Sequence, residues 1–330
     1  MAAPPDPIYS FRGNQSQVHC LNFLLKAGSE KLISGTRTGH VFVWDLPTKS
    51  LSDSFLTGDG TCISVLVPDK QDYFLTHNRS DCVKKWTDWK CTLEFKTKCL
   101  QYCAAKLLQA PASRAQLVAF PGGEERSIQV ASFEQEERVV SQMNYPGSAG
   151  NIMSLSDAGA GRVLALFEAG DLLLWDLRNP GKPQGAFRID LGADDTAPSA
   201  AMCLAFSAPK SLGVVGSSDN TLHPFALDAG GFRTLPSTKI TNEGTSHLCF
   251  RPDQKILAAA CWDSKVRLFS ARSIDSKTVF RPLAVLPTLV EDKSVSCVTF
   301  SDKPVESFGG KTILAAAGDA CSILLWDIYN

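Results

Sequence analysis

The sequence has 330 residues, 44% of them hydrophobic, with 33 basic and 34 acidic side chains. This balance predicts a globular protein with ample apolar material for a large core, and it lacks the basic excess expected of a nucleic-acid-binding protein. No apolar run reaches membrane-spanning length and the N-terminal stretch has no signal-peptide core, so we expect a soluble intracellular protein.

Short apolar runs separated by polar turns recur along the chain in groups of three. Runs of this length, with Pro-Asp or Asp-Ser in the gaps, are typical of three-stranded antiparallel meanders. One meander cannot bury both of its faces alone, so it needs copies beside it. The predicted groups are, in chain order, Val18–Phe23, Leu32–Thr36 and Val41–Trp44; Cys62–Val67, Tyr73–His77 and Cys82–Trp86; Cys99–Leu108, Gln116–Phe120 and Ser127–Ala131; Ile152–Leu155, Arg162–Phe167 and Asp171–Asp176; Ala201–Phe206, Ser211–Ser217 and Thr221–Ala226; His247–Phe250, Ile256–Cys261 and Val266–Phe269; and Ser294–Phe300, Thr312–Ala317 and Ser322–Ile328.

The third runs of these groups end about 40 to 60 residues apart, close to the repeat length of WD-type propeller blades. Several of them close on Trp-Asp, at Trp44, Trp175 and Trp326. A fourth, outer strand is expected between groups, in segments such as Ser50–Leu56, Arg138–Gln142 and Leu283–Pro287. We therefore predict an all-β fold, a single seven-bladed WD-repeat β-propeller that spans residues 1–330.

The segment Ile8–Arg12 stands before the first group and has no group of its own. In a closed ring it would form the outer strand of the last blade, beside Ser322–Ile328. A radial array protects its sheet edges only when its two ends are joined. We expect this pairing to close the ring.

Eleven cysteines could suggest disulfides or a metal site, but their positions favour the core. Cys20, Cys203 and Cys297 each stand three residues before a Phe, and Cys62 holds a comparable place. A free cysteine behaves as a small buried apolar residue, so a recurrent strand position suits it. We expect neither a metal nor any cofactor.

Two aspartates have the offset of the structural Asp in WD repeats. Asp219 and Asp263 stand six residues before Phe225 and Phe269, which take the place of the repeat's Trp. We expect them to hold their turns rather than to act in catalysis. The usual Gly-His dipeptide is missing, and Asn14 stands where the first blade would have it.

The sequence offers no convincing catalytic constellation. Five histidines are scattered along the chain without metal-ligand spacing, and neither a nucleophile elbow nor a phosphate-binding loop is present. A propeller can still carry an active site in its central channel, and a channel that gathers two or more titratable groups would favour that alternative. We predict that the protein is not an enzyme.

The turns before each third strand should crowd around one mouth of the ring, where partners could bind. Exposed Trp and Arg are frequent interface anchors, so Trp262, Arg37 and Arg79 stand out. The competing interpretation is that Trp262 packs on its neighbour and the arginines are only solvated. Trp89 is a further exposed candidate, and the residues of the mouth are Arg37, Arg79, Glu168, Ser218, Trp262 and Ala320.

One local motif, Trp175 to Arg178, resembles the WDxR signature of WD-repeat substrate receptors for cullin-type ubiquitin ligases. In those receptors the Arg docks on an adaptor. Because Trp-Asp is built into the repeat, a single Arg two places later is a weak signal. The cullin receptor is kept as an alternative function that would rest on Arg178.

Segments at both ends of the chain carry a resemblance to a known family, namely Pro4–Pro7, Arg12–His19, Arg251–Ala258, Trp262-Asp263 and Pro282–Leu286. They resemble the WD-repeat family of guanine nucleotide-binding protein β-subunit-like protein 1 and the ASTRA-associated subunit. That family is similar in fold to G-protein β subunits. Ile8 is already in a predicted strand, so a helix that grips a γ subunit has no place before it, and we expect no G-protein γ partner.

The resemblance implies a scaffold that works in the cytoplasm and the nucleus. Members of this family associate with the co-chaperone assembly that matures phosphatidylinositol-3-kinase-like kinases. They are linked through ASTRA to chromatin remodelling and the DNA-damage response. The expected partners are therefore these kinases and their co-chaperone subunits, and neither nucleic acid nor a membrane.

Overall fold

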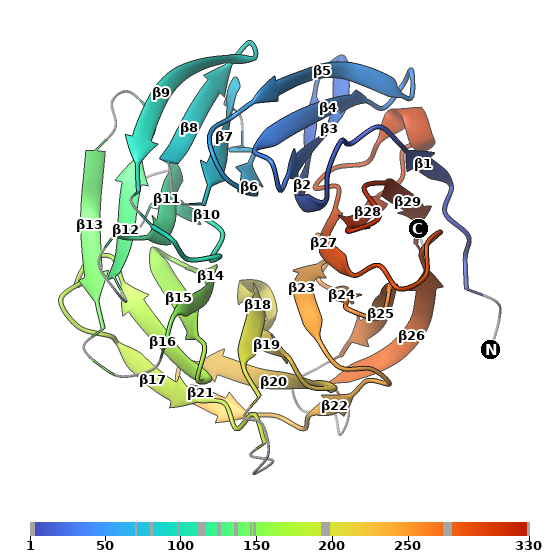
Figure 1. The fold of residues 1–330 in the computed structure, drawn as a ribbon. Helices are drawn as coiled ribbons and strands as arrows, with labels where there is room; N and C mark the ends of the chain where they lie inside the picture. The colour runs from blue at the N-terminus through green and yellow to red at the C-terminus, as the bar shows by residue number, and fades with distance from the viewer. Residues whose placement is uncertain are drawn as a thin grey trace.

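Seven antiparallel sheets stand around a central axis in the computed structural model, which describes residues 4–69, 71–79, 82–97, 99–110, 116–123, 127–134, 138–145, 147, 150–192, 199–272 and 279–328. Each sheet is one blade, with its first strand innermost (Figure 1). The predicted all-β seven-bladed propeller is confirmed. No helix in the described ranges is both long and apolar enough to cross a membrane.

In each of the first three blades, the four strands lie side by side in the order in which they occur along the chain. Blade one contains β2 (Val18–Lys26), β3 (Ser29–Thr36), β4 (His40–Asp45) and β5 (Ser50–Leu56). Blade two contains β6 (Cys62–Leu66), β7 (Tyr73–Asn78), β8 (Cys82–Thr87) and β9 (Lys90–Lys96). Blade three contains β10 (Lys106–Gln109), β11 (Gln116–Pro121), β12 (Ser127–Ser132) and β13 (Arg138–Asn144).

Blades four to six are built in the same way. Blade four contains β14 (Ile152–Gly159), β15 (Arg162–Phe167), β16 (Asp171–Asp176) and β17 (Gly185–Arg188). Blade five contains β18 (Ala201–Ser207), β19 (Leu212–Ser217) and β20 (Thr221–Asp228), with its outer edge divided into β21 (Gly231–Thr234) and β22 (Thr238–Lys239). Blade six contains β23 (Thr245–Phe250), β24 (Ile256–Cys261), β25 (Lys265–Ala271) and β26 (Phe280–Pro287).

Blade seven combines the two ends of the chain. It contains β27 (Val295–Phe300), β28 (Ile313–Gly318), β29 (Ile323–Asp327) and, at its outer edge, β1 (Tyr9–Phe11). The amide of Ile8 also donates to the carbonyl of Leu325 at 2.8 Å. Phe11, which is 2% exposed, packs 5.1 Å from the ring of Trp44 in blade one. The predicted closure of the ring by the N-terminal strand is confirmed.

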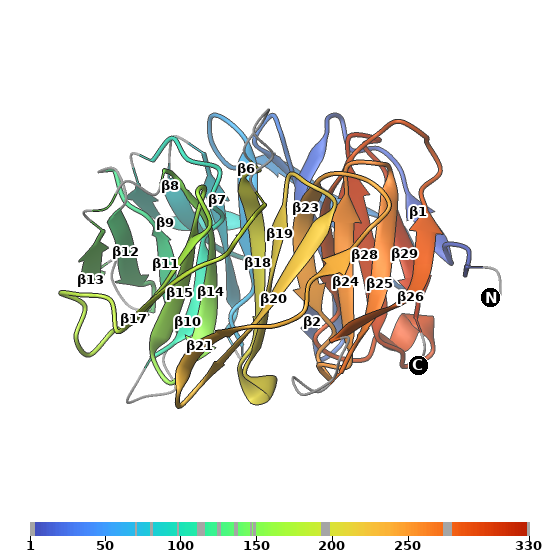
Figure 2. The same cartoon turned by 90° about the horizontal axis from the view of Figure 1, so that it is seen from below.

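Two faces of the ring can be distinguished by their turns. We call upper face the side with the turns between second and third strands, and lower face the side with the turns between first and second strands. The 3₁₀ turns η1 (Ala208–Lys210) and η2 (Glu306–Phe308) lie on the lower face, at the bottom of Figure 2.

The apolar core lies between neighbouring blades, in seven clusters of buried residues within the described part of the chain. Each cluster joins two adjacent sheets, as in the one where Phe23 and Leu32 of blade one meet Ile313 and Leu325 of blade seven. Because every blade buries both of its faces in this way, no meander has to be stable alone.

Third strands end on a buried tryptophan in blades one, two, four and seven, but the indole N–H has a hydrogen-bond acceptor in only two of these blades among the described residues. Trp44 donates to the hydroxyl of Ser34 at 3.0 Å, and Ser34 donates to Asn14 at 2.8 Å. Asn14 thus occupies the place expected for the missing His. In blade two, Trp86 donates in the same way to Thr76, which also stands ten residues earlier, at 2.9 Å.

Blades four and seven lack this hydroxyl. The equivalent positions, across the sheet from the residue two before each Trp, hold Ala165 and Ala316. The N–H groups of Trp175 and Trp326 therefore find no acceptor among the described residues, although both side chains are fully buried. The loss of one oxygen explains each orphaned donor.

The cysteines, all within the described residues, form no disulfides, and most of them are buried. Cys20, Cys62, Cys203 and Cys297 sit in the innermost strands, which is the recurrent position read from the sequence. They fill space beside the axis as small apolar side chains.

One predicted strand is wrong in length. The run Cys99–Leu108 is a strand only from Lys106 onward, where Lys106 pairs with Ala119 of β11, and the amide of the preceding Ala105 donates to the side chain of His77 instead of to β11. Residues 99–105, here called the mouth loop, leave the sheet and cross the upper face toward the axis (Figure 1).

Candidate protein-interaction surface at the channel mouth

The six turn positions read from the sequence all lie between second and third strands and therefore open on the upper face. Their side chains differ in freedom. Arg37 is exposed and donates to the side-chain oxygen of Gln17 at 3.0 Å. Glu168 is partly buried and accepts from the amide and the side chain of Asn151 at 3.3 and 3.2 Å. Ser218 and Ala320 are partly exposed.

Trp262 combines the two roles weighed from the sequence. One side of its indole lies so close to Gly244 that a Cβ at that glycine would stand 2.0 Å from the ring. The side chain is nevertheless 41% exposed. Trp262 therefore packs on the connection from blade five and still offers an apolar surface to a partner.

Trp89 is not the exposed residue that the sequence suggests. It lies in the turn between β8 and β9, on the lower face, and is partly buried against Phe55 and Phe74, at ring distances of 6.4 and 5.6 Å. The Lys31 ammonium lies 5.8 Å from its ring. Because Phe55 comes from the neighbouring blade, this packing is not visible in the local sequence.

Arg178 also lies on the lower face, in the turn between β16 and β17. Its guanidinium grips Asp176 with two parallel hydrogen bonds of 2.9 and 2.6 Å. This pairing holds the pKa of Asp176 below its usual value. The Arg side chain remains 65% exposed, so its outer edge faces solvent.

The two structural aspartates act in different ways. Asp219 accepts from the amide of Thr221 at 2.7 Å and from the hydroxyl of Ser217 at 2.6 Å, which ties the turn before β20. Asp263 instead forms an ion pair with Arg267, with distances of 2.8 and 2.7 Å. Neither contact involves a catalytic arrangement.

The mouth loop is the most unusual part of the upper face because it is irregular but firmly held. Arg79 donates from Nε to the carbonyl of Leu100 at 2.7 Å, and Gln101 accepts from the amide of Ile152 in blade four at 3.0 Å. The amide of Ala105 donates to Nδ1 of His77 at 3.3 Å. Within the loop, the side chains of Cys99 and Cys103 are buried.

This anchored loop presents two large apolar side chains to solvent. Leu100 is 68% exposed and Tyr102 is 60% exposed. The guanidinium of Arg79 stacks on the Tyr102 ring at 4.0 Å, which restricts the ring before any partner arrives. Ordered aromatic and Arg side chains lose little entropy on binding, so this cluster has the character of an interface anchor.

Sequence reasoning identified Arg79 but missed Leu100 and Tyr102. Both were placed inside the predicted strand Cys99–Leu108, where an apolar side chain needs no further explanation. The run is apolar for two separate reasons. Its cysteines are buried, whereas Leu100 and Tyr102 form an exposed apolar surface.

The central channel carries several polar side chains. His19, Lys106 and His247 line it, with no aspartate or glutamate among the described lining residues. Burial, reinforced by the charge of Lys106, lowers the pKa of His247 to about 4, and its Nδ1 donates to the carbonyl of Val298 at 2.9 Å. The described residues contain no group of three potential metal ligands. The channel therefore gathers titratable groups, but without a carboxylate to form an acid/base pair with them.

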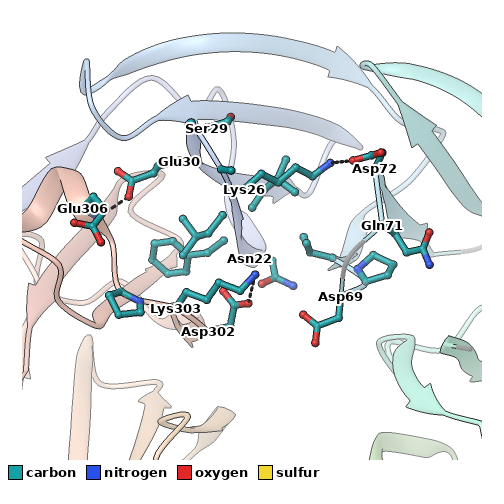
Figure 3. A pocket seen from close by; sticks show the side chains of 18 of the residues that line it. Asn22, Lys26, Ser29, Glu30, Asp69, Gln71, Asp72, Asp302, Lys303 and Glu306 are labelled. Atoms are coloured by element: carbon teal, nitrogen blue, oxygen red, sulfur yellow. Dashed lines mark hydrogen bonds and ion pairs between the residues drawn. The ribbon is translucent and has the colours of Figure 1, made fainter. Parts of the chain in front are cut away.

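A larger cavity of about 1170 Å³ opens on the lower face between blades seven, one and two (Figure 3). Lys26 pairs with Asp72 at 3.4 Å, and Glu30 accepts from the amide of Ser307 at 2.9 Å. The carboxylates along its wall outnumber the lysines, so the cavity repels acidic segments. The charged lining residues are Lys26, Glu30, Asp69, Asp72, Asp302, Lys303 and Glu306.

Comparison with known proteins agrees with this architecture. The family described as WD domain, G-beta repeat matches residues 5–45 and 236–270. The β-propeller domain of Cps50 (Swd1) from Myceliophteria thermophila superposes with a TM-score of 0.74, at 14% sequence identity, over 97% of this chain and 100% of that one. At this identity the likeness concerns the fold alone.

Two curated relatives are similar over most of the sequence. Guanine nucleotide-binding protein subunit beta-like protein 1 of Mus musculus is 25% identical over 342 residues, which cover 99% of this chain and 97% of the mouse protein. ASTRA-associated protein 1 of Penicillium rubens is 24% identical over 357 residues, 84% of this chain and 79% of that protein. The chain therefore has the fold of a seven-bladed β-propeller, with two stretches that match the WD-repeat family, and its resemblance to the guanine nucleotide-binding protein β-subunit-like and ASTRA-associated proteins is confirmed.

Proposed function

We propose that this propeller is a non-enzymatic scaffold that binds partner proteins at its upper face. The observation that carries the proposal is the mouth loop, where Leu100 and Tyr102 are exposed while Arg79 and Gln101 hold the backbone. Such pre-organised apolar surface favours binding of another protein.

The proposed partners are subunits of the co-chaperone assembly that matures phosphatidylinositol-3-kinase-like kinases, together with the kinases themselves. The name of the Penicillium relative supports an association with ASTRA. In this proposal the protein acts in both cytoplasm and nucleus and contributes to kinase stability, chromatin remodelling and the DNA-damage response. Neither a G-protein γ subunit, nucleic acid nor a membrane is among its ligands.

Affinity purification of the tagged full chain, followed by mass spectrometry, tests this function. Recovery of the kinase co-chaperone subunits would support it, and reduced levels of the kinases after depletion of the protein would link the contact to their stability. Recovery of a cullin adaptor that disappears in an Arg178→Ala variant would contradict it and favour a ubiquitin-ligase receptor.

A further inference from the structure

The central channel has the size of a ligand site. Its volume is about 440 Å³, within the range of small-molecule pockets, and the innermost strands of several blades line it. Tyr102 of the mouth loop borders this space, but the proposed protein-binding surface makes no use of the strand residues that line it.

Lys106, the first residue of β10, is the unusual group in the channel. Its ammonium forms no hydrogen bond or ion pair with any described residue, and the described lining residues include no carboxylate. Its positive charge acts on groups in two other blades. Burial raises the pKa of the Cys203 and Cys249 thiols, and the charge of Lys106 partly offsets that rise. The positive charge in the channel is thus not neutralised by the described lining.

Hydroxyl groups face the same space from other blades. Ser154 of β14, Ser246 of β23 and Ser296 of β27 line the channel, and none of their hydroxyls is hydrogen-bonded to a described residue. Each can donate an O–H to an anion, as Lys106 can donate its N–H groups.

We propose that the channel binds the phosphate group of a small molecule. One lysine and three hydroxyls placed on different blades offer donors from several sides. A tetrahedral phosphate carries enough acceptor oxygens to use such a set, whereas a carboxylate presents only two oxygens in one plane.

Titration of the full chain with inorganic phosphate, phenyl phosphate and acetate at constant ionic strength tests the site. Binding is followed by the ³¹P linewidth for the phosphates and by the rise in Tm for all three anions. Phosphate also stabilises proteins by exclusion from their surface, but that effect acts equally on every variant. The variant is Lys106→Met, and the matched control is Lys26→Met, which removes a lysine from the lower cavity.

We expect saturable phosphate binding in the wild type and in Lys26→Met, weakened at least tenfold in Lys106→Met. Tighter binding of phenyl phosphate would indicate a phosphorylated small molecule, and tighter binding of inorganic phosphate the free ion. In phosphate-free buffer the Tm of Lys106→Met should equal or exceed that of the wild type, because an uncompensated charge is removed. Equal phosphate binding by both lysine variants, equal affinity for acetate, or a lower Tm of Lys106→Met in that buffer would overturn the proposal.

Discussion

The strands of the ring and the mouth loop solve the same burial problem in opposite ways. In the three inner strands of each blade, alternating side chains enter cores shared with the blades on either side, and the large apolar strand residues that remain exposed lie on the outer strands β5, β13 and β26. In the mouth loop, two cysteines are buried and two larger side chains, Leu100 and Tyr102, are left in solvent. The comparison suggests that the ring supplies stability and the loop supplies the binding surface.

The largest expected effect comes from opening the ring. Deletion of residues 1–13 removes β1 and the buried ring of Phe11, so the free energy of unfolding should fall by at least about 3 kcal/mol, and solubility should fall with it. Chemical denaturation measures the change. Deletion of residues 1–7 keeps Ile8 and β1 and serves as the control. If the longer deletion were as stable as the full-length protein, closure would not stabilise the ring.

The junction between ring and loop should be sensitive to acid. Burial lowers the pKa of His77 from 6.5 to about 4. Below pH 6.5 the folded state then binds fewer protons than the unfolded state. The contribution of His77 to the free energy of unfolding is therefore fully present above that pH. It is lost as the pH falls toward 4, by about 3 kcal/mol. Denaturation series across this range should show a smaller pH dependence for His77→Gln than for the wild type. An identical slope for the two proteins would exclude the role of His77.

Within the ring, the hydroxyl of Ser34 should contribute measurably to the free energy of unfolding. Ser34→Ala leaves both the Trp44 N–H and the Asn14 side-chain oxygen without this partner, so we expect a loss of about 1–3 kcal/mol. The free energy of unfolding measures it. Thr76→Val in blade two should show a loss of the same order, and no change in either variant would mean that these indoles are satisfied by water.

The reverse change in blade seven should have the smallest effect on stability. Ala316→Ser places a hydroxyl at the position equivalent to Ser34 and can satisfy the orphaned Trp326 N–H, so we expect a gain of up to about 1 kcal/mol. Ala315→Ser is the matched control, because it buries the same hydroxyl on the other face of the strand. Equal destabilisation by both substitutions would contradict the proposed equivalence.

Most of the ring could be predicted from the sequence, because strand alternation and turn residues are local signals. Phe225 and Phe269 were correctly read as substitutes for Trp since their spacing is preserved. Trp89 and the mouth loop could not be read correctly, because their environment depends on neighbouring blades. Phe55 covers Trp89 from blade one, and Ile152 of blade four helps to hold the loop.

Quantitative affinity capture of partners by two surface variants tests most directly whether the mouth loop is the binding surface. Tyr102→Ala removes a side chain that is 60% exposed, and Leu51→Ala removes one that is 47% exposed on the outer strand β5. Both should change the free energy of unfolding by no more than about 0.5 kcal/mol, which is usual for surface substitutions. We predict that Tyr102→Ala recovers at least tenfold less partner protein while Leu51→Ala recovers the wild-type amount. Equal recovery by the two variants would contradict the assignment of function to the mouth loop.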